Sequence, residues 1–336
     1  MRFLNGNLYK TFAGLSVIGV FGLFVLGGLV RSTGSGMGCP DWPLCYGKYA
    51  PPLSEDELPE NYQEVFNQQR LVKVDNLVQL LNTLGMERQA ELILASPYLR
   101  NGHKFSVVKA YIEYINRLWG VLVGIFVLIM LFFALIKRKE LGVKLFWPIF
   151  GFLMVLINGW IGSKVVDSNL LGGLVTFHFF FAMVALLALI WSHPYRITFE
   201  DAQKPKIWLS LGLSISLFIQ MLVGTWVREL VDFQHANGFV FDLHAYKILG
   251  HSFSFHRLGF LVSLSLSFLQ YRAMGYSRSI SFYIMVLIVF QAVNGSLNLF
   301  FDFPGFWQAS HIFFAALVLS LQLYFFKSTL FLKKHD

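Results

Sequence analysis

Three histidines and a glutamate lie within runs of apolar residues long enough to cross a membrane: His178, His256, His311 and Glu113. Ionisable side chains in such runs cost about 2.5–3.5 kcal/mol each to insert, so they mark functional sites by default. Neutral imidazole is also a good ligand for iron. These residue types therefore indicate metal or haem chemistry at the level of the membrane.

Two of these histidines, His256 and His311, belong to separate apolar runs of the C-terminal half and are expected at equal depth. We expect them to approach a flat macrocycle from opposite faces, as the axial ligands of a haem. Arg257 follows His256 and is placed to neutralise a haem propionate near the aqueous edge. The alternative is that each histidine only forms hydrogen bonds between helices.

The N-terminal half offers a different set of side chains. His178 is expected to face Asn116, and an asparagine amide is a poor ligand for haem iron. Glu113 precedes Asn116 by one helical turn and shares its face. This set predicts a haem held by His178 alone, with an open face where Glu113 acts as acid, base or charge stabiliser. The alternative is that Glu113 pairs with Arg117, four residues on, and merely orients the helix.

An internal repeat relates these residues, because a polar or charged residue inside one half recurs at the matching place of the other. The chain divides into halves at 1–200 and 201–336, each of four spans. A four-helix bundle carries its cofactor site on inward-facing side chains, so each half should offer one interior site. The matched pairs are Asn116-Arg117 with His256-Arg257, His178 with His311, Asn158-Gly159 with Asn294-Gly295, and Arg31 with Arg228.

The elements that must position these residues are eight apolar runs. Of the 336 residues, 56% are hydrophobic and 14% are charged, against roughly 25% charged in soluble domains. A run of about 20 apolar residues spans the hydrocarbon core as a helix. We predict an all-α polytopic membrane protein whose eight transmembrane helices form two pseudo-symmetric four-helix bundles. The runs lie near residues 8–30, 107–136, 145–163, 170–192, 207–228, 252–270, 280–299 and 306–326.

The net charge of +8 reports topology and not nucleic-acid binding. Lys and Arg gather in the loops near 137–144, 196–206 and 272–278 and at both chain ends, with Lys327 counted in the C-terminal flank. The positive-inside rule then places both termini in the cytoplasm. We expect an integral protein of the cytoplasmic (inner) membrane, surrounded by lipid, with its haem sites toward the outer face.

The two cysteines, Cys39 and Cys45, both fall in the first loop, which this topology places outside the cytoplasm. An oxidising compartment is where a disulfide persists. The short spacing suits a structural clip and a redox-active pair equally well. A zinc pair is disfavoured, because no second pair of Cys or His at ligand spacing accompanies it.

The stretch from Gly28 to Pro43, GLVRSTGSGMGCPDWP, together with Glu113-Tyr114-x-x-Arg117 and the spaced histidines, resembles the haem A synthases. The resemblance covers the chain except about residues 52–104. It implies an oxidoreductase that converts haem O to haem A by oxidising one ring methyl to a formyl group, for the assembly of a terminal oxidase. The departure is Asn116, where many members of that family have histidine.

The resemblance also implies where the two haems lie. The half at 201–336 would hold a haem b through His256 and His311. The half at 1–200 would receive haem O as substrate near Glu113 and His178, with an extracytoplasmic insert at about 31–104. Haem O would be handed over by a haem O synthase, the electron donor is unidentified, and a homo-oligomer is consistent with the resemblance.

Two competing functions stay open at this point. A membrane cytochrome b with one or two haems would pass electrons without modifying haem, and a transporter would account for the repeat alone. The segment 52–104 is acidic at its start and then follows a helical apolar pattern. We predict one or two outer helices there, capping the first site or docking a partner, with a plain solvated excursion as the alternative.

Overall fold

The computed structural model describes residues 2–83, 85, 87–95, 104–167, 172–197, 206–236, 238–241, 245–276 and 279–332. Eight helices of the described chain are long and apolar enough to span a membrane, as predicted. They are α1 (Arg2–Ser32), α5 (Val107–Ile136), α7 (Phe146–Asp167), α8 (Gly172–Ser192), α9 (Ile207–Ala236), α10 (Gly250–Ala273), α11 (Ile280–Phe300) and α12 (Gly305–Leu332).

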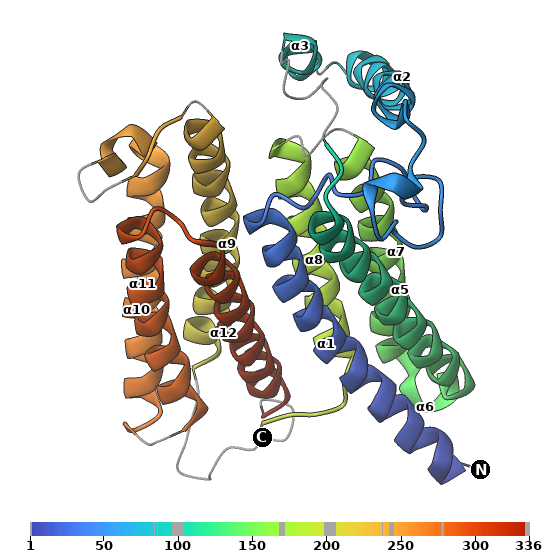
Figure 1. Ribbon diagram of the computed structural model, residues 1–336. Coiled ribbons are helices and arrows are strands. Elements are labelled where there is room, and N and C mark those ends of the chain that lie inside the picture. The colour runs from blue at the N-terminus through green and yellow to red at the C-terminus, as the bar shows by residue number, and fades with distance from the viewer. Residues whose placement is uncertain are drawn as a thin grey trace.

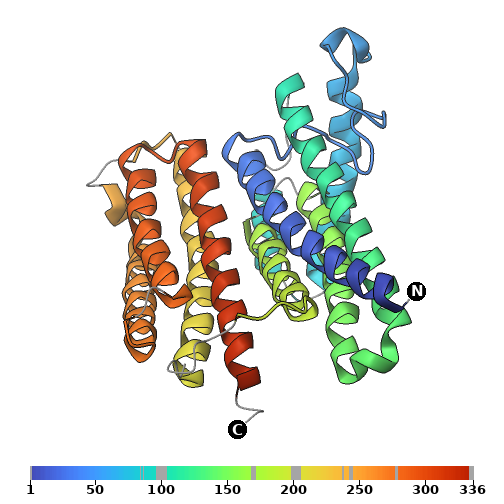
Figure 2. The same cartoon turned by 90° about the horizontal axis from the view of Figure 1, so that it is seen from below.

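The spanning helices pack as two closed rings of four. α1 packs on α5, α5 on α7, α7 on α8, and α8 back on α1, while α9, α10, α11 and α12 repeat the same order. α1 also lies along α12, and α8 contacts α9 and α12, which joins the rings. Figures 1 and 2 show the blue-to-green and the yellow-to-red groups side by side. Corresponding helices of the two rings are therefore α1 and α9, α5 and α10, α7 and α11, and α8 and α12.

The apolar core runs through both rings without a break. Its fully buried members include Ala13 of α1, Met183 of α8, Leu213 of α9 and Leu319 of α12. Large apolar side chains also cover the outside of the bundle, since lipid solvates them as well as the core does. Among them are Phe132, Trp160, Trp208 and Phe268.

The insert forms two helices outside the bundle, in agreement with the prediction of one or two outer helices. α2 (Tyr62–Thr83) and α3 (Glu87–Ala95) pack on each other, and α2 also reaches α7. Their shared core consists of Val74, Leu77, Val78, Leu81, Ala90 and Ile93. Both helices lie at the end of the bundle opposite the two chain termini (Figure 1). We call this end the insert end.

Short elements complete the described chain at the loops. They are the 3-10 helices η1 (Glu55–Glu57), η2 (Gly142–Leu145) and η3 (Ala245–Leu249), and the single turn α6 (Arg138–Leu141). The predicted loop charges at 198–205, 277–278 and 333–336 lie outside the described residues.

Lys327 is not a solvated flanking charge. It lies inside α12, which extends beyond the predicted end at residue 326, and only 3% of it is exposed. Its Nζ donates hydrogen bonds to the carbonyl oxygens of Ile190, at 2.8 Å, and of His193. Those carbonyls end α8, where unpaired acceptors favour a cation. Lys327 therefore connects the first ring to the second at the end of the bundle that carries both chain termini, which we call the termini end.

Candidate functional site

His256 packs against a glycine of the preceding span, and we call such a glycine-lined contact for an imidazole a seat. A Cβ at Gly224 of α9 would lie 3.3 Å from Cε1 of His256, so the imidazole rests directly on the α9 backbone. Gln220, one turn before Gly224, donates from Nε2 to the carbonyl oxygen of His256 at 2.8 Å. The same Nε2 lies 3.2 Å from Nδ1 of the ring. A Cβ at Gly259 would overlap Oε1 of Gln220, so this glycine makes room for the amide.

His311 has the same kind of seat between α11 and α12. A Cβ at Gly295 would lie 3.2 Å from Cε1 of His311, and Gln291, four residues before Gly295, donates to the carbonyl oxygen of His311 at 2.9 Å. Nδ1 of His311 is buried and has no hydrogen-bond partner among the described residues. The pattern of Gln, three residues and Gly thus places two imidazoles in equivalent settings.

His178 has a third seat, between α7 and α8. A Cβ at Gly162 would lie 3.0 Å from Cε1 of His178, and Asn158 stands four residues before this glycine. The sequence repeat pairs Asn158-Gly159 with Asn294-Gly295, but the contacts pair Gly162 with Gly295. When the two spans are aligned by the glycine that contacts the imidazole, α7 is shifted by three residues from the sequence-based alignment. The repeat therefore holds in this span, but with a different register.

The fourth position, between α1 and α5, lacks the features of the other three. Asn116 replaces the histidine, Leu23 takes the place of the glutamine, and Trp119 stands where the second ring has Gly259. Nε1 of Trp119 donates to the carbonyl oxygen of Gly19 at 2.8 Å, which fixes the indole against α1. Gly27 is the counterpart of Gly224. A Cβ there would have no described atom within 4 Å apart from its chain neighbours and the nearby backbone of its own helix.

The second ring therefore has the donors that an axially ligated haem needs. Its two histidines come from facing helices α10 and α12, and the bare backbone beside each ring leaves space that a Cβ would fill. The described residues contain no cluster of three or more His, Cys, Asp or Glu side chains able to hold a metal ion. Two imidazoles from facing helices are the ligand set that a haem with two axial histidines would take.

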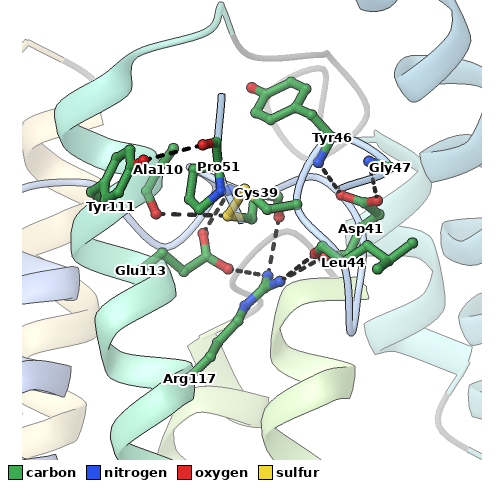
Figure 3. The surroundings of a disulfide bond; sticks show 11 residues. Cys39, Asp41, Leu44, Tyr46, Gly47, Pro51, Ala110, Tyr111, Glu113 and Arg117 are labelled. Atoms are coloured by element: carbon green, nitrogen blue, oxygen red, sulfur yellow. Dashed lines mark hydrogen bonds and ion pairs between the residues drawn. A yellow bond between two sulfur atoms is a disulfide. The ribbon is translucent and has the colours of Figure 1, made fainter. Parts of the chain in front are cut away.

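The loop after α1 is closed by a disulfide between Cys39 and Cys45, with an S–S distance of 2.01 Å. A disulfide is thus present, which both the structural clip and the redox-active pair require, and both cysteines are buried. The Asp41 carboxylate accepts the backbone N–H groups of Tyr46, at 2.6 Å, and Gly47, at 2.8 Å. These contacts fold the loop into a compact cap over α5 (Figure 3).

Glu113 and Arg117 hold this loop on α5, and Figure 3 shows both side chains pointing into it. Oε2 of Glu113 accepts the backbone N–H of Cys39 at 2.9 Å, and Oε1 forms an ion pair with Arg117. The Arg117 guanidinium also donates to the carbonyl oxygens of Asp41, Leu44 and Cys39, at 2.7, 2.8 and 3.2 Å. Only 3% of Glu113 is exposed. The pairing that was the alternative for Glu113 is present, and it fixes the loop as well as the helix.

The far end of the loop carries a solvent-exposed ion pair. Nζ of Lys48 lies 2.8 Å from Oε2 of Glu57. The hydrogen bond from Lys48, and a second one from the backbone N–H of Leu53, lower the pKa of the Glu57 carboxyl below its usual range. Exposed pairs of this kind contribute little to stability.

The structure separates the remaining predicted residues. Arg257 is exposed, and its guanidinium lies 5.9 Å from the ring centroid of Phe253. Its repeat counterpart, Arg117, is instead partly buried under the disulfide loop. Asn116 is half-buried, one turn from Glu113. Sequence reasoning missed Gln220 and Gln291; the signal was present as a glutamine four residues before a glycine in each span.

Comparisons with known proteins agree with this arrangement. The family model of the COX15-CtaA cytochrome oxidase assembly proteins matches residues 10–78 and 101–323. The chain is 28% identical to "Heme A synthase" of Shewanella oneidensis over 62% of this chain and 54% of that protein. It is 24% identical to "Heme A synthase" of Rickettsia canadensis over 95% of this chain and 96% of that protein. For "Heme A synthase" of Pelagibacter ubique the values are 30%, 68% and 64%.

The match to the Shewanella protein spans about half of that protein's length, whereas the match to the Rickettsia protein is nearly complete. The family model includes all eight spans, the disulfide loop and the three seated histidines, and it omits the middle of the insert. The chain therefore belongs to the COX15-CtaA family of cytochrome oxidase assembly proteins.

Proposed function

We propose that this protein is a haem A synthase, an oxidoreductase that oxidises a ring methyl of haem O to a formyl group and so provides haem A for terminal oxidase assembly. The family and the names of its relatives support this function. The observation that carries it is the inequality of the two rings. One ring has two seated histidines, and the other has one, with an asparagine at the position that corresponds to the second.

In this proposal the second ring holds a resident haem b between His256 and His311. That haem supplies one-electron transfer when it is bound. The chain's own contribution is to fix the two imidazoles, through Gln220 and Gln291, so that each ring keeps one orientation. Arg257 stays the sequence-based candidate for a propionate partner.

The first ring is the proposed substrate site. Haem O binds with His178 as its single protein ligand, and Asn116 leaves the opposite face open. Glu113 is the proposed acid, base or charge stabiliser, because it is the buried carboxylate nearest to Asn116 along α5. Arg117 keeps that carboxylate oriented and balances its charge, and the disulfide loop shields it from water.

The proposed placement follows from the charge pattern. The chain lies in the cytoplasmic membrane with both termini inside, so the disulfide loop and the insert face the oxidising side. Haem O arrives from a haem O synthase within the lipid, and an electron donor of unidentified kind reduces the resident haem. Copies of the chain assemble as a homo-oligomer in this proposal.

A cytochrome b that only passes electrons is the second candidate function. The two seated histidines of the second ring alone would suit it. It is not favoured, because the relatives are named as synthases.

The test is to produce the protein in cells that make haem O but lack haem A synthase activity, then to identify the extracted haems by chromatography and mass. We expect haem A. Folded protein that yields only haem B, in cells shown to contain haem O, would favour the cytochrome instead. Glu113→Gln keeps the acceptor for the Cys39 N–H, so it should retain the haem content and lose the product.

A further inference from the structure

A charged cluster joins the two rings near the insert end. Arg31 of α1 donates to Oδ2 of Asp232 from Nη2 at 2.8 Å and from Nε at 3.2 Å. Arg228 of α9 reaches Oδ1 of the same carboxylate with its Nη2 at 2.5 Å. The two arginines are repeat counterparts, and they share one aspartate across the boundary between the rings.

Arg228 has donors that this contact does not use. Its Nε and Nη1 atoms are buried and have no hydrogen-bond partner among the described residues. The side chain as a whole is 18% exposed. A buried donor without an acceptor is costly, and the cost is larger for a charged group. The two unsatisfied donors of this guanidinium therefore point to an acceptor that binds from outside the chain.

The position of Arg228 on α9 indicates which site its two unpaired donors serve. Arg228 follows Gly224 by four residues, and residues four apart share a helix face. Gly224 is the residue on which the His256 ring rests. At 1.5 Å per residue, Arg228 lies about 6 Å nearer the insert end on the same face. The neighbouring Glu229 is bonded instead to Thr176 of α8.

We propose that an unpaired donor of Arg228, Nε–H or Nη1–H, binds a propionate carboxylate of the haem held between His256 and His311. Each of these N–H groups can donate one charge-assisted hydrogen bond to a carboxylate oxygen. The inference rests on the proposed function only in needing a haem in the second ring. It assigns the carboxylate to Arg228 and not to the exposed Arg257, whose guanidinium lies over Phe253.

The experiment uses full-length protein purified without haem from haem-limited cells. Haem b and its propionate dimethyl ester are titrated into it, and binding is followed by absorbance. The wild type should bind the free acid roughly 10-fold more tightly or better, the value of a charge-assisted hydrogen bond. Arg228→Gln should bind both haems alike, whereas Asp232→Asn, which removes the ion pair but keeps the cation, should retain the preference.

Five results would overturn the assignment. The preference could survive in Arg228→Gln, or it could disappear equally in Asp232→Asn, which would make Arg228 a structural ion-pair residue. It could disappear only in Arg257→Gln. Equal binding of both haems by the wild type, with anionic phospholipid protecting Arg228 from chemical modification, would assign the unpaired donors to a lipid phosphate. Failure of the wild type to bind either haem would overturn the haem site itself, and with it this inference.

Discussion

The seam between α1 and α5 and the seam between α9 and α10 are repeat counterparts with opposite contents. In the second seam Gln220 enters beside Gly259 and steadies His256. In the first seam the glutamine position is Leu23. Trp119 fills the space of the glycine and bonds to the α1 backbone.

The difference teaches that Asn116 is not an isolated departure. A histidine at that position would lack the amide that holds its counterpart, because Leu23 cannot donate a hydrogen bond. Only the glycine, Gly27 in the first seam and Gly224 in the second, is common to both. A Cβ at Gly27 would meet no described atom within 4 Å apart from its own helix, so the space beside Gly27 is open. The first ring thus lacks the histidine, the glutamine and the second glycine of this seat, which suits the proposed substrate, because a substrate must be released.

The largest expected effect breaks the second seat directly. His256→Ala and His311→Ala should each remove the proposed resident haem, since each would delete one of its two proposed ligands. Haem content per protein and the absorbance spectrum of purified material measure this. His251→Ala, on the same helix as His256 but exposed, is the matched control and should keep its haem.

The two arginines that follow the compared positions give the next effect. Arg117→Gln should destabilise the protein by about 2 kcal/mol, because partly buried charge-assisted hydrogen bonds to three loop carbonyls are lost. Arg257→Gln should change thermal stability little, because Arg257 is exposed. Thermal unfolding in detergent checks both, and equal losses for the two variants would contradict the asymmetry.

The seat glycines provide a more precise contrast. Gly295→Ala places a Cβ 3.2 Å from the His311 ring, and such overpacking costs typically 1–3 kcal/mol. Gly27→Ala meets open space and should be neutral or slightly stabilising, since alanine favours a helix. Haem retention during a thermal ramp compares the two, and a larger loss in Gly27→Ala would show that the first seam is closed.

The smallest effect concerns the termini end, where the rings are joined through His193. Burial, and then the nearby Lys327 charge, lower the pKa of His193. A depressed histidine pKa means that the folded state favours the neutral ring, so stability is complete above the usual value of about 6.5 and declines as the pH falls below it. His193→Gln should remove part of the stability loss between pH 7.5 and 5.5. An unchanged pH profile would exclude His193 as a contributor.

The sequence predicts the fold well because lipid leaves few alternatives. Eight apolar runs must become helices, and polar residues such as His178 stand out against them. It does not predict how polar side chains choose partners. Arg31 and Asp232 lie 201 residues apart in the chain, yet they bond to each other. Lys327 looks like a flanking charge, but it turns inward to the carbonyls that end α8.

The histidines of the candidate site are predictable from the sequence, and the side chains that support them are less so. The repeat identifies His256 and His311 without any coordinates. Gln220 remains hidden, because a glutamine in a span indicates only polarity until the facing helix is known. The role of Arg117 depends on the disulfide loop folding over α5, which requires contacts 73 to 78 residues apart.

The most direct test of the inequality of the rings is electron paramagnetic resonance of the first-site haem alone. The His256→Ala/His311→Ala double variant is loaded with haem O and compared with the same variant carrying Leu23→Gln, Asn116→His and Trp119→Gly. We predict a high-spin ferric signal from the former, because only His178 binds the iron, and a low-spin signal from the latter. A low-spin, two-histidine signal in the variant that retains Asn116 would contradict the account.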